Sequence, residues 1–179
     1  LQSISNYFFG NPPYDKIWVY RLPSIIGVIL SIFFIYNFVR KEYNQNNAIL
    51  CVCFLILPLI TISEVHQAKT DSFLFFTVVA SNLILIKALK DNSLNLKNKL
   101  FFWFISAIGV LIKGPIIFVF TILPLCVLSM FKKKNYFKII WTIRGFLLFL
   151  LVSIPWFIAI TIISEGLFWH ESAINDLLN

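Results

Sequence analysis

Residues 145–164 read GFLLFLLVSIPWFIAITIIS, a stretch of 20 residues without Asp, Glu, Lys or Arg. A helix rises about 1.5 Å per residue, so about 20 apolar residues cross a hydrocarbon core about 30 Å thick. The whole chain has this character: 59% of its 179 residues are hydrophobic and 13% are charged. Soluble chains average about 45–50% apolar and about 25% charged. These values exclude a water-soluble globular protein, and they exclude an intrinsically disordered one.

Five further apolar segments precede this stretch and are separated by short polar connections. The expected spans are residues 22–39, 45–63, 72–89, 97–113, 115–131 and 145–163. No alternation of polar and apolar residues supports a β-barrel. The sequence therefore predicts an all-α, polytopic membrane helical bundle of about six transmembrane helices, forming a single transmembrane domain over residues 1–179.

Basic residues gather on one side of the six expected spans. Eleven of the 15 lie there: Arg40, Lys41, Lys87, Lys90, Lys97, Lys99, Lys132, Lys133, Lys134, Lys138 and Arg144. Membrane proteins concentrate Lys and Arg in cytoplasmic connections, so this side is expected to be cytoplasmic and its connections to be solvated basic loops. The net charge of +7 is then explained without a nucleic-acid partner.

Residues 64–71, EVHQAKTD, connect two expected spans on the opposite, outward side. Their ionisable side chains are Glu64, His66, Lys69 and Asp71. Ionisable groups at a membrane face often line a cavity or a pathway. The alternative is a solvated loop in which Thr70 or Asp71 caps the next helix, and the two interpretations are compatible because a helix N-terminus also attracts anions.

The turn Lys113-Gly114-Pro115 joins two spans with almost no connecting chain. Glycine suits the sharp reversal, and proline suits the first turn of the next helix. Lys113 is then expected at the same outward face as residues 64–71. There it either extends to lipid headgroups or holds a phosphate group as a donor of up to three hydrogen bonds.

Four segments, in this order, resemble motifs of one known family. They are Arg21-Leu22-Pro23-Ser24, the block Glu64 to Asp71 followed by Ser72-Phe73-Leu74-Phe75-Phe76, Ile112-Lys113-Gly114-Pro115, and Pro155-Trp156-Phe157. The chain resembles the membrane glycosyltransferases of the GT-C type that take sugars from polyprenyl phosphate. That group includes the aminoarabinose transferases of lipid A, the dolichyl-phosphate-mannose protein mannosyltransferases and related transferases of the lipopolysaccharide core.

The resemblance implies a helix bundle with an outward-facing cavity that a lipid donor enters from the side. It implies a polyprenyl-phosphate-linked sugar donor, a lipid, glycan or protein acceptor, contact with membrane lipids, and a place in the cell envelope. The expected location is the bacterial inner (plasma) membrane, with the active face outward. Family members carry a further acidic residue in a first external loop and a long C-terminal region. This chain matches neither, so it is expected to be the middle of a larger enzyme.

Sugar transfer from a phosphate requires a carboxylate for the acceptor proton and cations for the departing phosphate. The expected catalytic residues are Asp71 and Glu64, and the expected phosphate-binding residues are Lys113, His66, Lys69 and Arg21. Because the first-loop acid would be the base, Asp71 is expected to support catalysis rather than act as sole base. No cofactor is expected beyond a divalent cation, for which Asp71 and Glu64 could be ligands.

Two other interpretations remain open from the sequence. One is a fragment of a transporter or permease, because outward-facing ionisable residues also mark substrate pathways. Transporters commonly contain inverted repeats and mid-membrane broken helices, and the two halves of this chain show no convincing similarity. The other is an inactive remnant of a split glycosyltransferase gene.

Overall fold

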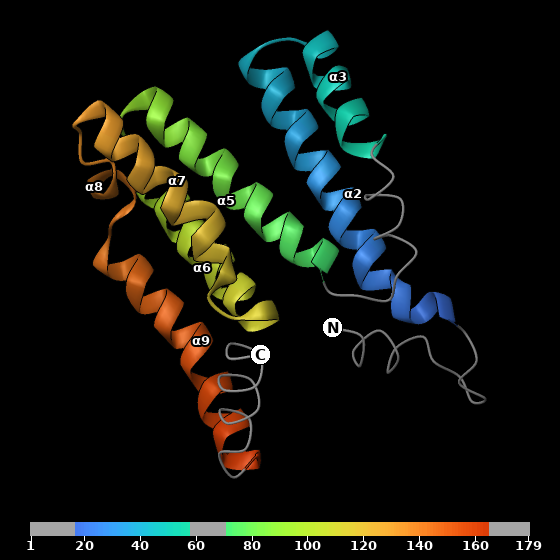
Figure 1. The fold of residues 1–179 in the computed structure, drawn as a ribbon, viewed down its shortest axis with the longest axis vertical. Helices are drawn as coiled ribbons and strands as arrows, with labels where there is room; N and C mark the ends of the chain where they lie inside the picture. Colours follow the sequence, from blue (N-terminus) through green and yellow to red (C-terminus); the bar gives the residue numbers. More distant parts are fainter. Residues whose placement is uncertain (1–16, 58–70, 165–179) are drawn as a thin grey trace.

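The computed structural model describes residues 17–57 and 71–164. Every regular element within those two ranges is an α-helix. In chain order the helices are α2 (Ile17–Glu42), α3 (Gln45–Ile56), α5 (Asp71–Asp91), α6 (Leu96–Lys113), α7 (Ile116–Lys132), α8 (Phe137–Ile140) and α9 (Ile143–Ile163) (Figure 1). The expected fold class, an all-α membrane helical bundle, is confirmed.

Each of the six expected spans overlaps a helix, but the helices differ in length and polarity. Within the described ranges, three are long and apolar enough to cross a membrane: residues 19–42 of α2, all of α5 and all of α9. Helices α3 and α7 are apolar but shorter, and α6 contains three lysines. The last part of the second expected span, residues 58–63, lies outside the described residues. The number of six membrane crossings therefore stays a prediction.

Helices α2 and α5 run side by side in the same direction. Near the beginning of α5 and the middle of α2, a Cβ atom added to Gly27 would lie 2.6 Å from the carbonyl oxygen of Ser72 and 2.8 Å from Cα of Phe73. At their far ends, Lys90 of α5 forms an ion pair with Glu42 of α2. Because glycine has no side chain, it allows the two backbones to touch at the first of these points.

Small residues line the buried sides of this helix pair. On α2, Ser24 and Ser31 are fully buried, three residues before and four residues after Gly27. The hydroxyl of Ser31 donates to the carbonyl oxygen of Gly27 at 2.8 Å, so it is satisfied within its own helix. Most buried residues of α5 are also small or hydroxylated: Ser72, Thr77, Ala80, Ser81 and Ala88. Small side chains permit the close packing that holds membrane helices together.

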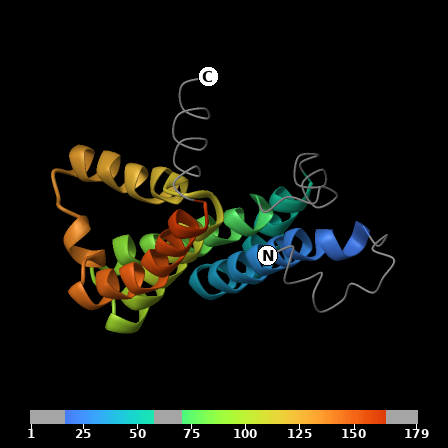
Figure 2. The ribbon, with the colours of Figure 1, turned by 90° about the horizontal axis from the view of Figure 1, so that it is seen from below.

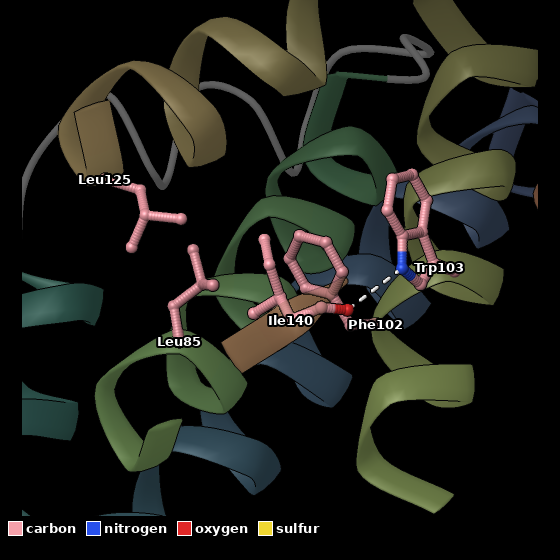
Figure 3. Packing of buried hydrophobic residues seen from close by; sticks show 5 residues of the cluster. All are labelled: Leu85, Phe102, Trp103, Leu125 and Ile140. Atoms are coloured by element: carbon pink, nitrogen blue, oxygen red, sulfur yellow. Dashed lines mark hydrogen bonds between the residues drawn. The ribbon is translucent and has the colours of Figure 1, made fainter. Parts of the chain in front are cut away.

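Helix α5 lies at the centre of the bundle and packs against α2, α6 and α7, while α6 also packs against α9. Figure 2 shows α7, in gold, set above α5 and α6. The larger apolar cluster consists of Leu85, Phe102, Trp103, Leu125 and Ile140 (Figure 3). A second cluster, Leu74, Val110 and Ile117, joins α5, α6 and α7 near the opposite end. Together these clusters fix α6 along most of its length.

The basic residues gather at one end of the bundle, which we call the basic end. Helices α2, α5 and α7 end there, and α6 and α9 begin there, along the top and left of Figure 1. Contacts between the helix ends include the Glu42–Lys90 ion pair and a hydrogen bond of 2.6 Å from Lys134 to Asn92. All eleven basic residues assigned to one side by the sequence belong to this end.

The connection between α7 and α9 differs from the solvated loop that the sequence predicts. It contains the short helix α8, whose Ile140 is only 1% exposed. The indole Nε1 of Trp103 on α6 donates a hydrogen bond of 3.2 Å to the Ile140 carbonyl oxygen (Figure 3). Ile140 thus holds the connection between α7 and α9 against α6. Burial of its side chain and the hydrogen bond from the Trp103 indole offset the conformational entropy lost when the connection is ordered.

Candidate functional site

The two motifs at the non-basic end meet in an ion pair. Nζ of Lys113 lies 2.6 Å from Oδ1 of Asp71. Asp71 is the first residue of α5, and Lys113 is the last residue of α6. The antiparallel packing of these two helices therefore places one carboxylate and one ammonium at the same end of the bundle. We call this pair the site pair.

Both side chains of the site pair remain accessible to a ligand. The side chain of Lys113 is 50% exposed and that of Asp71 is 37% exposed. Ion pairs with this much exposure stabilise a protein by at most about 1 kcal/mol. An ammonium has three donors, so the bond to Asp71 leaves two for another acceptor. A phosphate can therefore bind Lys113 without a large loss of folding energy.

Each member of the pair is positioned by its own helix end. Asp71 lies in the first turn of α5, where the partial positive charge of the helix terminus stabilises a carboxylate. Lys113 lies in the last turn of α6, where the partial negative charge stabilises an ammonium. Each charge therefore interacts favourably with its own helix end, and the antiparallel helices place the two side chains at one level of the bundle.

The turn after Lys113 depends on a glycine conformation. Gly114 has φ 72° and ψ −156°, which is backbone that residues with a side chain rarely adopt. Its N–H donates to the carbonyl oxygen of Val110 at 2.8 Å and closes α6. A Cβ on Gly114 would meet nothing within 4 Å, so backbone conformation, not space, requires glycine here. Pro115 follows as the residue immediately before α7.

Arg21 lies on α2, and no contact joins it to the site pair among the described residues. It precedes Gly27 by six residues, which is about 9 Å along a helix axis. Its Nε atom is buried, and within the described ranges it has no hydrogen-bond partner. A buried unpaired guanidinium nitrogen is costly, and an anionic group nearby would satisfy it.

Three of the expected site residues, Glu64, His66 and Lys69, lie outside the described residues. Their roles, and the second carboxylate that a divalent cation would need, stay predictions. Within residues 17–57 and 71–164, no three His, Cys, Asp or Glu side chains gather as a metal site.

The close approach of Gly27 to Ser72, the residue that follows Asp71, was not predicted from the sequence. A recognisable signal was present, since Ser24, Gly27 and Ser31 recur every three or four residues and so share one helix face. The direct contact of Asp71 with Lys113 was also not predicted, because the sequence placed them only on the same side of the membrane.

Searches of curated proteins and of solved structures each found no match. A family model described as dolichyl-phosphate-mannose-protein mannosyltransferase matches residues 1–158. The match includes both residues of the site pair, the turn between α6 and α7 and most of α9. It confirms the resemblance that the four sequence motifs carry, and it supports a membrane glycosyltransferase over a transporter. The chain belongs to the dolichyl-phosphate-mannose-protein mannosyltransferase family.

Proposed function

We propose that the chain transfers a sugar from a polyprenyl-phosphate donor to an acceptor hydroxyl at the end of the bundle that carries the site pair. The acceptor is a lipid, a glycan or a protein. The observation that carries this proposal is the 2.6 Å contact between Lys113 and Asp71. It sets a cation that can neutralise the departing phosphate beside a carboxylate, and such a transfer uses groups of both kinds.

In the proposed reaction, the acceptor oxygen bonds to the anomeric carbon while the bond from that carbon to the phosphate oxygen breaks. The bonding electron pair leaves with the polyprenyl phosphate, and the hydroxyl proton passes to a carboxylate. Lys113 neutralises the departing phosphate with the donors that Asp71 does not occupy. Asp71 orients Lys113 and stabilises the positive charge that develops on the sugar, as carboxylates do in glycoside hydrolysis.

Further groups are proposed around this pair. Arg21 is a candidate for a second phosphate contact, supported by its buried Nε, which has no hydrogen-bond partner among the described residues. Glu64 is proposed as the second carboxylate, with Asp71, around the sugar or a divalent cation, and Lys69 and His66 as additional phosphate contacts. The excess of positive charge at the opposite end supports an orientation in which the site pair faces outward. The proposed location is the bacterial inner membrane.

The proposal is tested with the full-length gene expressed in membranes and a panel of radiolabelled polyprenyl-phosphate sugars that includes mannose. We expect Asp71→Asn to lower product formation about a hundredfold or more. Lys113→Ala removes a charged hydrogen bond to phosphate, so it should raise the donor KM about tenfold to a hundredfold. Lys113→Arg should restore part of the donor affinity.

The matched control is Lys90→Met, because Lys90 and Glu42 form the other ion pair of the described residues, at the basic end. This variant should transfer sugar at the wild-type rate. The exchanged pair Asp71→Lys with Lys113→Asp keeps an ion pair but moves the charges, so it should stay inactive. Unchanged product from both Asp71→Asn and Lys113→Ala, or full activity of the exchanged pair, would overturn the proposal.

A further inference from the structure

A groove at the basic end lies outside the site pair and takes no part in the proposed transfer. It has a volume of about 460 Å³ and is lined by residues of α2, α5 and α6. Its least exposed lining residue is Ala80 of α5, at 1% exposure, while Phe33 of α2 is 59% exposed and Phe101 of α6 is 40% exposed. The groove therefore runs over α5 between two flanking helices and opens on the outer surface of the bundle.

The lining of this groove changes from polar to apolar along its length. Lys41, Lys87 and Asn98 lie where α2 and α5 end and α6 begins. Phe34 and Ala80 each lie seven residues earlier on their helices than the lysines, which is about 10 Å deeper in the bundle. A molecule that fills the groove must therefore have a polar head at the basic end and an apolar body directed toward the bundle centre.

The net charge of the described residues at the mouth of the groove is positive, although the carboxylate of Glu42 also attracts Lys41 and Lys87 electrostatically. The one acidic side chain beside these lysines on α2, Glu42, forms its ion pair with Lys90. Lys41 and Lys87 have no ion-pair partner among the described residues. Lysines at the level of the lipid headgroups attract anionic lipids, and each contributes about 1 kcal/mol to the binding free energy.

From this arrangement we infer that the groove binds an anionic diacyl phospholipid of the leaflet at the basic end. The phosphate contacts Lys41 and Lys87, Asn98 donates to a headgroup oxygen, and an acyl chain lies against the phenylalanines. A zwitterionic lipid brings a positive group along with its phosphate, so it would offset less of the lysine charge than an anionic lipid does. A water-soluble anion would leave the apolar part of the groove unfilled. The bound lipid would join α2 to α6 across α5 at the end remote from the site pair.

The test is a titration of the purified full-length protein by native mass spectrometry. The probes are phosphatidylglycerol, phosphatidylcholine with the same acyl chains, and inorganic phosphate. We expect Lys41→Gln with Lys87→Gln to weaken phosphatidylglycerol binding about thirtyfold, or about fivefold for each lysine. The matched control is Lys97→Gln with Lys99→Gln, which removes two charges at the same end but outside the groove, and it should bind as the wild type does.

A second variant tests the apolar part of the groove without changing its charge. Leu83→Trp fills the space beside Ala80 and should lower phosphatidylglycerol binding while leaving sugar transfer intact. Equal binding of the two lipids, an equal loss in the Lys97 and Lys99 control, or no bound phosphatidylglycerol on the wild type would overturn the inference. Tight binding of inorganic phosphate together with an unaffected Leu83→Trp variant would also overturn it, because the acyl chain would then have no role.

Discussion

Replacing Gly27 with alanine adds a methyl group at the point where α2 touches α5. The three nearest atoms belong to the backbone of Ser72 and Phe73 and lie 2.6–2.8 Å from the added carbon. Ordinary van der Waals contacts begin at 3.4 Å, so the two helices must separate by about 0.8 Å at this point. Backbone atoms cannot rotate out of the way as a side chain does. The whole first turn of α5 therefore has to move.

The expected loss of stability follows from two opposing effects. Adding carbon atoms to a tightly packed interface costs about 1–3 kcal/mol, and alanine regains up to about 1 kcal/mol through its better helix propensity. We expect Gly27→Ala to lower the free energy of unfolding by about 1 kcal/mol and Gly27→Leu by about 3 kcal/mol. The measurement is unfolding of the purified protein by titration with SDS in mixed micelles.

The same substitution should reduce sugar transfer, because Asp71 immediately precedes Ser72 on the displaced turn. A displacement of about 1 Å in a reacting group can lower a rate about a hundredfold. We expect Gly27→Ala to lower product formation at least about tenfold, although both residues of the site pair are intact. The control is Ile29→Phe, which adds bulk to α2 at a side chain that is 58% exposed, and it should change neither quantity. If both Gly27 variants unfold and transfer sugar as the wild type does, the contact does not position the site.

Two further substitutions test contacts that hold α6 in place, one at the turn that follows it and one within it. Gly114→Ala forces a side chain into a backbone conformation of φ 72° and ψ −156°, so it should lower the free energy of unfolding by about 1–3 kcal/mol. It should also raise the donor KM, because the strained turn displaces Lys113. Wild-type values of both quantities would contradict this conformation of Gly114. Trp103→Phe removes the hydrogen bond to Ile140 and should lower the free energy of unfolding by about 1–3 kcal/mol in the SDS titration. The control is Trp141→Phe, at a side chain that is 51% exposed, and it should lower the free energy of unfolding by less. Equal losses of stability in the two variants would show that the hydrogen bond from the Trp103 indole contributes nothing.

Much of the secondary structure could be predicted because long uncharged segments leave few alternatives to helices. In a bilayer every backbone group must find its hydrogen bond within the segment, so an apolar stretch such as residues 145–164 predicts a helix directly. The reversal at Gly114-Pro115 was predictable for a similar local reason. Glycine and proline each restrict the backbone in a characteristic way, and the structure places Gly114 at positive φ.

The choice of neighbours was harder to predict from the sequence. Apolar residues surround α2 on all sides, so periodicity does not identify the face that packs against α5. The information lies instead in the small residues Ser24, Gly27 and Ser31, whose spacing marks the face where another backbone can approach. The contact between Asp71 and Lys113 depends on the pairing of α5 with α6, so no local pattern could reveal it.

The docking of Trp103 has a consequence for the rotational phase of α6. Trp103 contacts α8 and α9 from the first half of this helix, and Lys113 follows ten residues later as its last residue. Each residue of an α-helix turns the chain by about 100°. Inserting or deleting one residue between these two positions would therefore rotate the ammonium by more than a quarter turn away from Asp71. Changes in chain length are easier to accommodate in the non-helical connections at residues 92–95 and 133–135, whereas the number of residues between Trp103 and Lys113 has to stay the same.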